Sequence, residues 1–158
     1  MNDIENINPK ITQYQASRLK NLIEEISSCC QERVVFQAKK FSLAPAELRS
    51  LLLFKHERYL TVTAIAQKLE VAKSRVTRIL DGLLKKKMIY RIDDPEDARI
   101  KLIGLTQAGQ KKTKDIDGFM TELHHALVLT LKPEDRKSVL SSLELLRSSM
   151  DAVKERLL

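Results

Sequence analysis

Apolar residues recur at spacings of three and four along most of the chain, which is the period of an amphipathic helix. The first such stripe lies within residues 12 to 40, a segment without proline or glycine. Its members are Ala16, Leu19, Ile23, Ile26 and Cys30. A second helix is predicted from Pro45 to about His56, because proline is tolerated in the first turn of a helix.

The central part of the chain predicts two short helices followed by two short strands. Residues 61 to 70 favour a helix with Ile65, Ala66 and Leu69 facing inward, and residues 74 to 87 favour a second helix after a turn at 71 to 73. Residues 90 to 92 and 99 to 105 favour strands, and the acidic segment 93 to 97 between them favours a turn. This order predicts a winged helix-turn-helix.

Two further helices are predicted after the wing. Thr106 can cap the first of them, which runs to about Leu131, and Pro133 begins the second. The apolar positions of the last helix are spaced four-three-four-three-four, and they are Val139, Leu143, Leu146, Met150, Val153 and Leu157. This heptad pattern is typical of a helix that packs along another helix. We therefore predict a homodimer interface from these residues together with Leu19, Ile23 and Ile26, with packing inside one chain as the alternative.

The predicted fold class is mainly α with a small β wing: a winged helix-turn-helix on a helical dimerisation domain formed by the N- and C-terminal helices. The expected divisions are a dimerisation helix at 1–42, a DNA-binding winged helix at 43–106 and dimerisation helices at 107–158. A length of 158 residues with 43% hydrophobic and 31% charged residues suits a folded chain of this size.

Positive charge is concentrated around the predicted winged helix. The whole chain carries a formal charge of +7, and Lys and Arg gather between residues 72 and 101. On the helix beginning at Ser74, Val76, Ile79, Leu80 and Leu83 fall on one side, and polar residues that suit base edges and phosphates fall on the other. The candidate DNA-contacting residues are Lys73, Ser74, Arg75, Thr77, Arg78, Asp81 and Lys85 on this helix, and Thr61, Thr63, Arg91, Arg99 and Lys101 on the preceding helix and the wing. Double-stranded DNA is thus the expected partner, and a winged helix that contacts protein or RNA is the alternative.

The segment from Leu60 through Gln110 resembles the MarR family of transcription regulators. The helix-turn-helix positions that carry the resemblance are Leu60-Thr61, Ile65-Ala66, Leu69, Ser74, Val76-Thr77-Arg78 and Leu83. Two further motifs match the wing and the segment after it, Asp94-Pro95-Glu96-Asp97-Ala98-Arg99 and Leu105-Thr106-Gln107-Ala108-Gly109. The resemblance implies a homodimeric regulator, expected to be a repressor, that places two recognition helices in successive major grooves of an inverted repeat.

Three positions depart from the family pattern. Ala98 replaces the first of two wing arginines, Lys87 stands where a glycine commonly ends the recognition helix, and Ala72 stands where a capping Ser or Thr is frequent.

The resemblance also implies a small aromatic or anionic ligand near the junction of the dimerisation helices and the winged helix, or a response to thiol oxidation. The side chains expected near that junction are Tyr14, Arg18, Phe36, Arg49 and His125.

No catalytic motif, cofactor motif or metal-binding motif is found, so neither enzyme activity nor a cofactor is expected. Adjacent residues on a helix point about 100° apart, so His124 and His125 cannot easily share one metal ion. We predict that Cys29 and Cys30 are reduced and partly buried, with a redox-sensing thiol as the alternative. The polar, acidic N-terminus and the short apolar runs resemble neither a signal peptide nor a membrane span, so the cytoplasm is the expected location.

Overall fold

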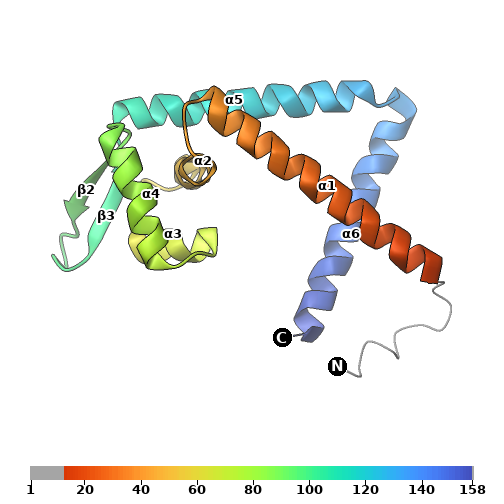
Figure 1. Ribbon diagram of the computed structural model, residues 1–158, viewed down its shortest axis with the longest axis horizontal. Coiled ribbons are helices and arrows are strands. Elements are labelled where there is room, and N and C mark those ends of the chain that lie inside the picture. The colour runs from red at the N-terminus through yellow and green to blue at the C-terminus, as the bar shows by residue number, and fades with distance from the viewer. Residues whose placement is uncertain (1–12, 158) are drawn as a thin grey trace. The chain divides into compact units, whose positions relative to one another are not determined.

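The computed structural model describes residues 13–157 and confirms a mainly helical fold with a small sheet (Figure 1). The elements are α1 (Gln13–Lys40), α2 (Pro45–Leu52), the 3-10 turn η1 (Leu53–Lys55), β1 (Tyr59–Thr61), α3 (Val62–Leu69), α4 (Lys73–Lys85), β2 (Ile89–Asp93), β3 (Lys101–Leu105), α5 (Gln107–Thr130) and α6 (Pro133–Leu157). The predicted start of the first helix at residue 12 lies outside the described residues, as do the rest of segment 1–12 and residue 158. The chain forms two compact units, Met1–Thr113 and Lys114–Leu158; the divisions at 42/43 and 106/107 remain predictions.

The core of the first unit lies among α2, α3, α4 and the sheet. The largest fully buried side chains of this core are Leu48, Leu51, Ile65, Val76, Leu80, Leu83 and Ile103. Val76, Ile79, Leu80 and Leu83 are all buried, which confirms the predicted apolar face of the helix that begins near Ser74. Burying this face fixes α4 in rotation about its own axis and turns its polar face to solvent.

The sheet has three antiparallel strands in the order β1-β3-β2, where the sequence predicted only two. The missing strand, Tyr59–Thr61, has three residues, which is too short to show a period of two. The predicted start of β3 at Arg99 was also two residues early. Ile100 N donates to Asp97 O at 2.8 Å and Asp94 N donates to Ile100 O at 3.0 Å, so these residues form the wing turn instead.

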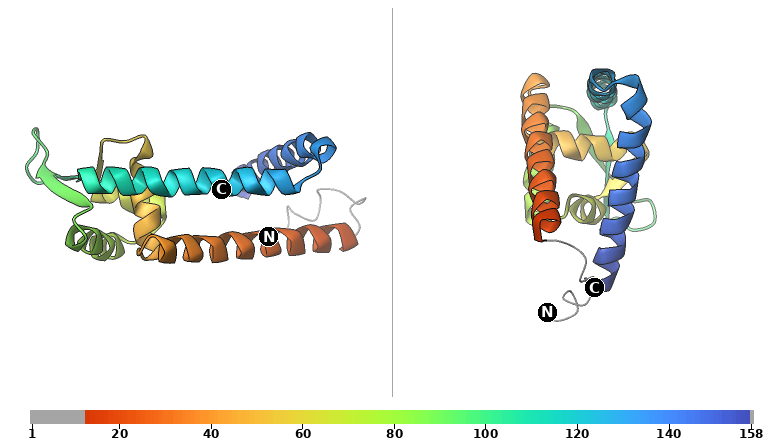
Figure 2. Two further views of the ribbon diagram at one scale, coloured as in Figure 1. Left: turned by 90° about the horizontal axis from the view of Figure 1, so that it is seen from above. Right: turned by 90° about the vertical axis from the view of Figure 1, so that its right-hand side faces the viewer.

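Two tyrosines brace the face of the sheet around Gly104. Tyr59 and Tyr90 are the neighbours of Gly104 on the flanking strands, and their rings lie edge to face with centroids 6.5 Å apart. A Cβ on Gly104 would lie 2.7 Å from Cζ of Tyr90, so only glycine leaves room for both rings. A hydrogen bond between the two hydroxyls lowers the pKa of Tyr59 and raises the pKa of Tyr90. The hairpin of β2 and β3 projects from the helices of its unit (Figures 1 and 2).

Helix α1 is one uninterrupted rod of 28 residues (Figure 2), and its buried residues are Gln37 and Ala38 near its C-terminal end. Cys29 and Cys30 lie before that end and are both exposed, so the prediction of partial burial was wrong for the single chain. The apolar stripe that was expected to cover them is itself uncovered: Leu19 is 46% and Ile26 52% exposed.

In the second unit, α6 is 25 residues long and has no buried residue. Its seam is largely open to solvent, with Leu143, Met150 and Val153 each about half exposed and Leu157 64% exposed. No helix within residues 13–157 has both the length and the apolar character needed to cross a membrane. Over the same residues, no cluster of three His, Cys, Asp or Glu side chains could hold a metal ion.

Candidate nucleic-acid interface

The candidate interface is built from α3, the turn after it, and α4. Thr61 caps α3, its hydroxyl accepting a hydrogen bond from Ala64 N at 3.1 Å. Glu70 ends α3 in the left-handed conformation, with φ of 55°, and allows the sharp turn into α4. Helix α4 begins after Ala72, which provides no side-chain cap. Thr61 therefore has a structural role in the helix-turn-helix in addition to its place among the predicted DNA contacts.

The structure places the predicted recognition residues of α4 together on its exposed side. Those residues are Lys73, Ser74, Arg75, Thr77, Arg78, Asp81 and Lys85. The hydroxyl of Thr77 donates to Lys73 O at 3.1 Å, so it lies along the helix surface. In the described part of the chain, neither Arg75 nor Arg78 has a hydrogen bond or an ion pair. Two guanidinium groups are thus exposed and uncommitted on the face that the buried core turns outward.

A cavity of about 500 Å³ lies along one flank of α4, next to the start of α2. It is lined by Ala44, Ala46, Glu47, Ser74, Arg75, Arg78 and Ile79. Each residue of a helix advances about 100°, so Arg75 lies at the edge of the polar face, toward Ile79, whereas Arg78 lies near its middle. Arg78 therefore extends from the middle of the exposed face, and Arg75 from its edge.

Asp81 and Arg91, both predicted to contact DNA, form an ion pair with each other. Arg91 Nη2 donates to Asp81 Oδ1 at 3.0 Å, joining β2 to α4. The side chain of Arg91 is 38% exposed and that of Asp81 is 51% exposed, so the pair lies at the surface. The sequence contained no signal of this contact, because the residues lie on different elements with no common period.

The acidic residues of the wing hold its backbone. Asp94 Oδ1 accepts from Glu96 N and Asp97 Oδ1 accepts from Arg99 N, both at 2.9 Å. The Asp97 carboxylate therefore supports the backbone of Arg99. Lys101 forms an ion pair with Asp93 and donates to Ala98 O at 3.2 Å, whereas the exposed Arg99 side chain has no partner among the described residues. Thr63, on α3, is exposed too.

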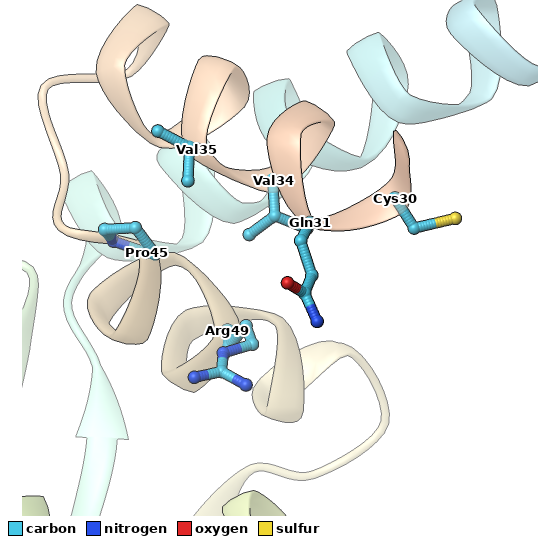
Figure 3. Close-up of a pocket in the computed structure, with 6 residues that line it drawn as sticks. All are labelled: Cys30, Gln31, Val34, Val35, Pro45 and Arg49. Carbon is cyan, nitrogen blue, oxygen red and sulfur yellow. The ribbon is translucent and has the colours of Figure 1, made fainter. Parts of the chain in front are cut away.

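A second cavity, of about 430 Å³, lies between α1 and α2 (Figure 3). It is lined by Cys30, Gln31, Val34, Val35, Pro45 and Arg49. Gln31 and Val34 extend from α1 toward α2 in Figure 3, whereas the Cys30 sulfur points away from Arg49 and accepts from Arg33 Nη2 at 3.6 Å. The walls are mainly apolar and Arg49 supplies a cationic group.

Of the five side chains expected near a ligand, the structure places only Arg49 in this cavity. Tyr14 and Arg18 lie at the start of α1, and Arg18 is about 18 Å from Cys30 along the helix axis at 1.5 Å per residue. Phe36 is 61% exposed and is not among the lining residues. His125 is exposed and belongs to the second unit. Sequence reasoning did not place Cys30, Gln31, Val34, Val35 or Pro45 in a cavity, since the spacing of residues along one helix does not show which neighbouring helix they face.

Comparison with known proteins supports the same assignment for the winged helix. Residues 43–101 match the model of the MarR family. This part of the chain, the winged helix, is similar to that family. The chain is 41% identical over 61 residues to YpoP, an uncharacterised helix-turn-helix regulator of Bacillus subtilis. The aligned segment covers 39% of this chain and 43% of YpoP. It is 31% identical over 86 residues to the transcriptional repressor MdtR of the same species, and this alignment covers 54% of this chain and 56% of MdtR.

The chain thus spans about half the length of these curated relatives. Its match to a solved structure is longer. The crystal structure of a MepR–DNA complex from Staphylococcus aureus superposes with a TM-score of 0.65 at 27% identity, covering 83% of this chain and 98% of MepR. The resemblance noted over Leu60 to Gln110 is confirmed, and the similar architecture extends to the flanking helices.

Proposed function

We propose that this chain is a transcription regulator of the MarR type that binds a specific DNA sequence as a homodimer and has no enzymatic activity. The observation that carries the proposal is the exposed face of α4, where Arg75 and Arg78 have no partner in the described part of the chain. The opposite face is anchored by Val76, Leu80 and Leu83, each fully buried. A basic, rigidly held helix face beside a projecting wing suits the major groove of duplex DNA.

Within this function the side chains divide into two roles. Arg78, with Ser74 and Thr77 beside it, reads base edges, because a guanidinium near the middle of the face can make two hydrogen bonds to guanine. Arg99 on the wing, together with Lys73 and Lys85, contacts phosphates or the narrow minor groove, which gives affinity without reading sequence. Arg91 and Lys101 contribute mainly by supporting the wing, since each is paired with a carboxylate.

The homodimer is supported by two apolar stripes that the single chain leaves exposed. Helix α6 has no buried residue, and α1 exposes Leu19 and Ile26. Exposed apolar surface of this extent is typical of an interaction site. A two-fold dimer would present two recognition helices to half-sites about 10 bp apart in an inverted repeat.

Regulation follows from the cavity between α1 and α2. Its apolar walls and the guanidinium of Arg49 suit a small aromatic acid, whose ring would contact Val34 and Val35 while its carboxylate pairs with Arg49. The relative MdtR is named a repressor, and we propose repression here too, with ligand binding releasing the operator.

The deciding experiment is selection of genomic DNA fragments by the purified chain, followed by sequencing of the bound fragments. We expect one enriched inverted repeat, bound at least a thousandfold more tightly than unrelated duplex in fluorescence anisotropy at constant salt, as is typical of specific DNA-binding proteins. Duplex RNA and a duplex with a scrambled repeat serve as matched competitors. Equal binding to all three, or no enriched sequence, would reject operator recognition and favour an RNA-binding or protein-binding winged helix.

A further inference from the structure

A buried carboxylate lies in the same cavity as the two uncommitted recognition arginines. Glu47, on α2, lines that cavity with Arg75 and Arg78, and its side chain is only 9% exposed. It caps α2 by accepting a hydrogen bond from Ala44 N at 2.8 Å. A carboxylate beside two guanidinium groups would ordinarily form an ion pair with one of them, because the planar fork of arginine matches its two oxygens.

The Glu47 carboxylate forms its ion pair with Lys86 instead. Its Nζ lies 2.5 Å from Oε2 of Glu47 and donates to Ser42 O at 3.0 Å, so it also joins the turn between α1 and α2 to the end of α4. Gly82 allows this close approach, since a Cβ there would overlap Oε1 of Glu47. In the described part of the chain, Lys86 is the ion-pair partner of Glu47.

We propose that Lys86 is a positioning residue that holds Glu47 and thereby keeps Arg75 and Arg78 free for DNA. Without the ammonium group, Glu47 keeps its place at the α2 cap and pairs with Arg75 or Arg78 across the cavity. That contact competes directly with DNA for the same guanidinium groups. The new ion pair then fills the cavity, so that a DNA phosphate can no longer reach it. The recognition face also loses a free guanidinium group that could read bases. This inference rests on the DNA binding proposed above.

The test compares Lys86→Met with a matched control, Lys87→Met, and with the double variant Lys86→Met/Glu47→Gln. Lys87 is exposed, adjacent and equally charged, and in the described part of the chain its side chain has no hydrogen bond or ion pair with Glu47. The glutamine retains an oxygen that can accept from Ala44 N, so the cap of α2 survives. Circular dichroism and sedimentation establish that each variant is folded and has the parent's oligomeric state, and Lys86→Gln replaces Lys86→Met where the latter does not fold.

We expect Lys86→Met to weaken operator binding by about tenfold more than Lys87→Met, the order expected for losing one arginine–base contact. The double variant should return to the affinity of Lys87→Met, because the competing carboxylate is gone. Equal loss in Lys86→Met and Lys87→Met overturns the proposal. So does a larger loss that Glu47→Gln fails to restore, since Lys86 would then contact DNA itself.

A second measurement needs no DNA. Phenylglyoxal modifies free guanidinium groups, and peptide mass spectrometry reports the extent of modification at Arg75 and Arg78. Modification should be high in the parent, reduced in Lys86→Met and restored in the double variant, while Arg99 stays constant as an internal reference. Unchanged modification in Lys86→Met overturns the proposal. If the parent binds no operator but the modification pattern holds, the proposed function fails while the role of Lys86 stands.

Discussion

Lys87 is expected to be the site of a stabilising substitution. Helices α1, α3 and α4 are each followed by a residue in the left-handed conformation: Ser42, Glu70 and Lys87, with φ of 57°, 55° and 55°. None of the three is glycine, the residue that adopts this conformation without steric cost. After α4, Lys87 N donates to Leu84 O at 2.8 Å and Met88 N donates to Leu83 O at 3.0 Å. These two bonds are those of a Schellman motif, which normally has glycine at the position of Lys87.

Lys87→Gly should stabilise the fold by about 0.5–1 kcal/mol. A Cβ in the left-handed region costs roughly 1–2 kcal/mol, and the substitution removes that cost. Against it stands the extra freedom of glycine in the unfolded chain, about 0.5–1 kcal/mol. The hydrogen bond from Thr106 Oγ1 to Lys87 O, at 2.7 Å, involves only the backbone of residue 87 and is retained. For a chain of this size the gain corresponds to a rise in Tm of about 1–4 °C.

The assay is urea unfolding followed by circular dichroism at one fixed protein concentration, because dimer stability depends on concentration. Lys87→Ala is the matched control: it removes the same charge but keeps the Cβ, so it should stay near the parent. The difference between the two variants isolates the backbone conformation from the loss of the ammonium group. If Lys87→Gly is no more stable than Lys87→Ala, strain at this helix end is not a real cost.

Four further variants test the interface, the dimer and the thiols. Arg78→Ala should cost about 1–3 kcal/mol of binding free energy on the selected operator and much less on unrelated duplex. Arg99→Ala should weaken binding to both duplexes and lower the slope of log affinity against log salt by about one. If Arg78→Ala binds the operator as the parent does, the recognition face is misassigned. Leu146→Asp should shift sedimentation to monomer or aggregate, because a charge in an apolar contact costs several kcal/mol; a tight dimer would exclude this seam from the interface. Replacing Cys29 and Cys30 with Ser should leave operator binding equally insensitive to mild peroxide as in the parent, and a peroxide response that disappears in the double variant would establish a redox sensor.

Local periodicity was sufficient to predict most of the fold. The buried face of α4 follows directly from the spacing of Val76, Ile79, Leu80 and Leu83, since apolar residues on one side of a helix must be covered. Thr106 was predicted to cap the helix after the wing, and its Oγ1 accepts from Gly109 N at 3.0 Å. Both features depend on residues close together in the chain.

Features that join distant segments were not predictable in the same way. The ion pairs Asp81–Arg91 and Glu47–Lys86 each depend on how two elements pack, so the spacing of residues within one element does not predict them. The exposure of Cys30 was misjudged for a related reason. Lying on an apolar stripe implies burial only when a second surface covers that stripe, and in the single chain most of α1 is uncovered.

These pairings change how the basic character of the winged helix should be understood. Counting Lys and Arg between residues 72 and 101 suggests a broadly positive surface, but several of those charges are committed to acids of the same unit. Lys86 holds Glu47, Arg91 holds Asp81 and Lys101 holds Asp93. Other wing carboxylates accept backbone hydrogen bonds and shape the turn. Among the arginines of this segment, Arg75, Arg78 and Arg99 have no ion-pair partner in the described part of the chain, whereas Arg91 is paired. If the chain binds DNA as proposed, we expect its selectivity for DNA sequence to depend less on the net charge of +7 than on which arginines the internal ion pairs leave free.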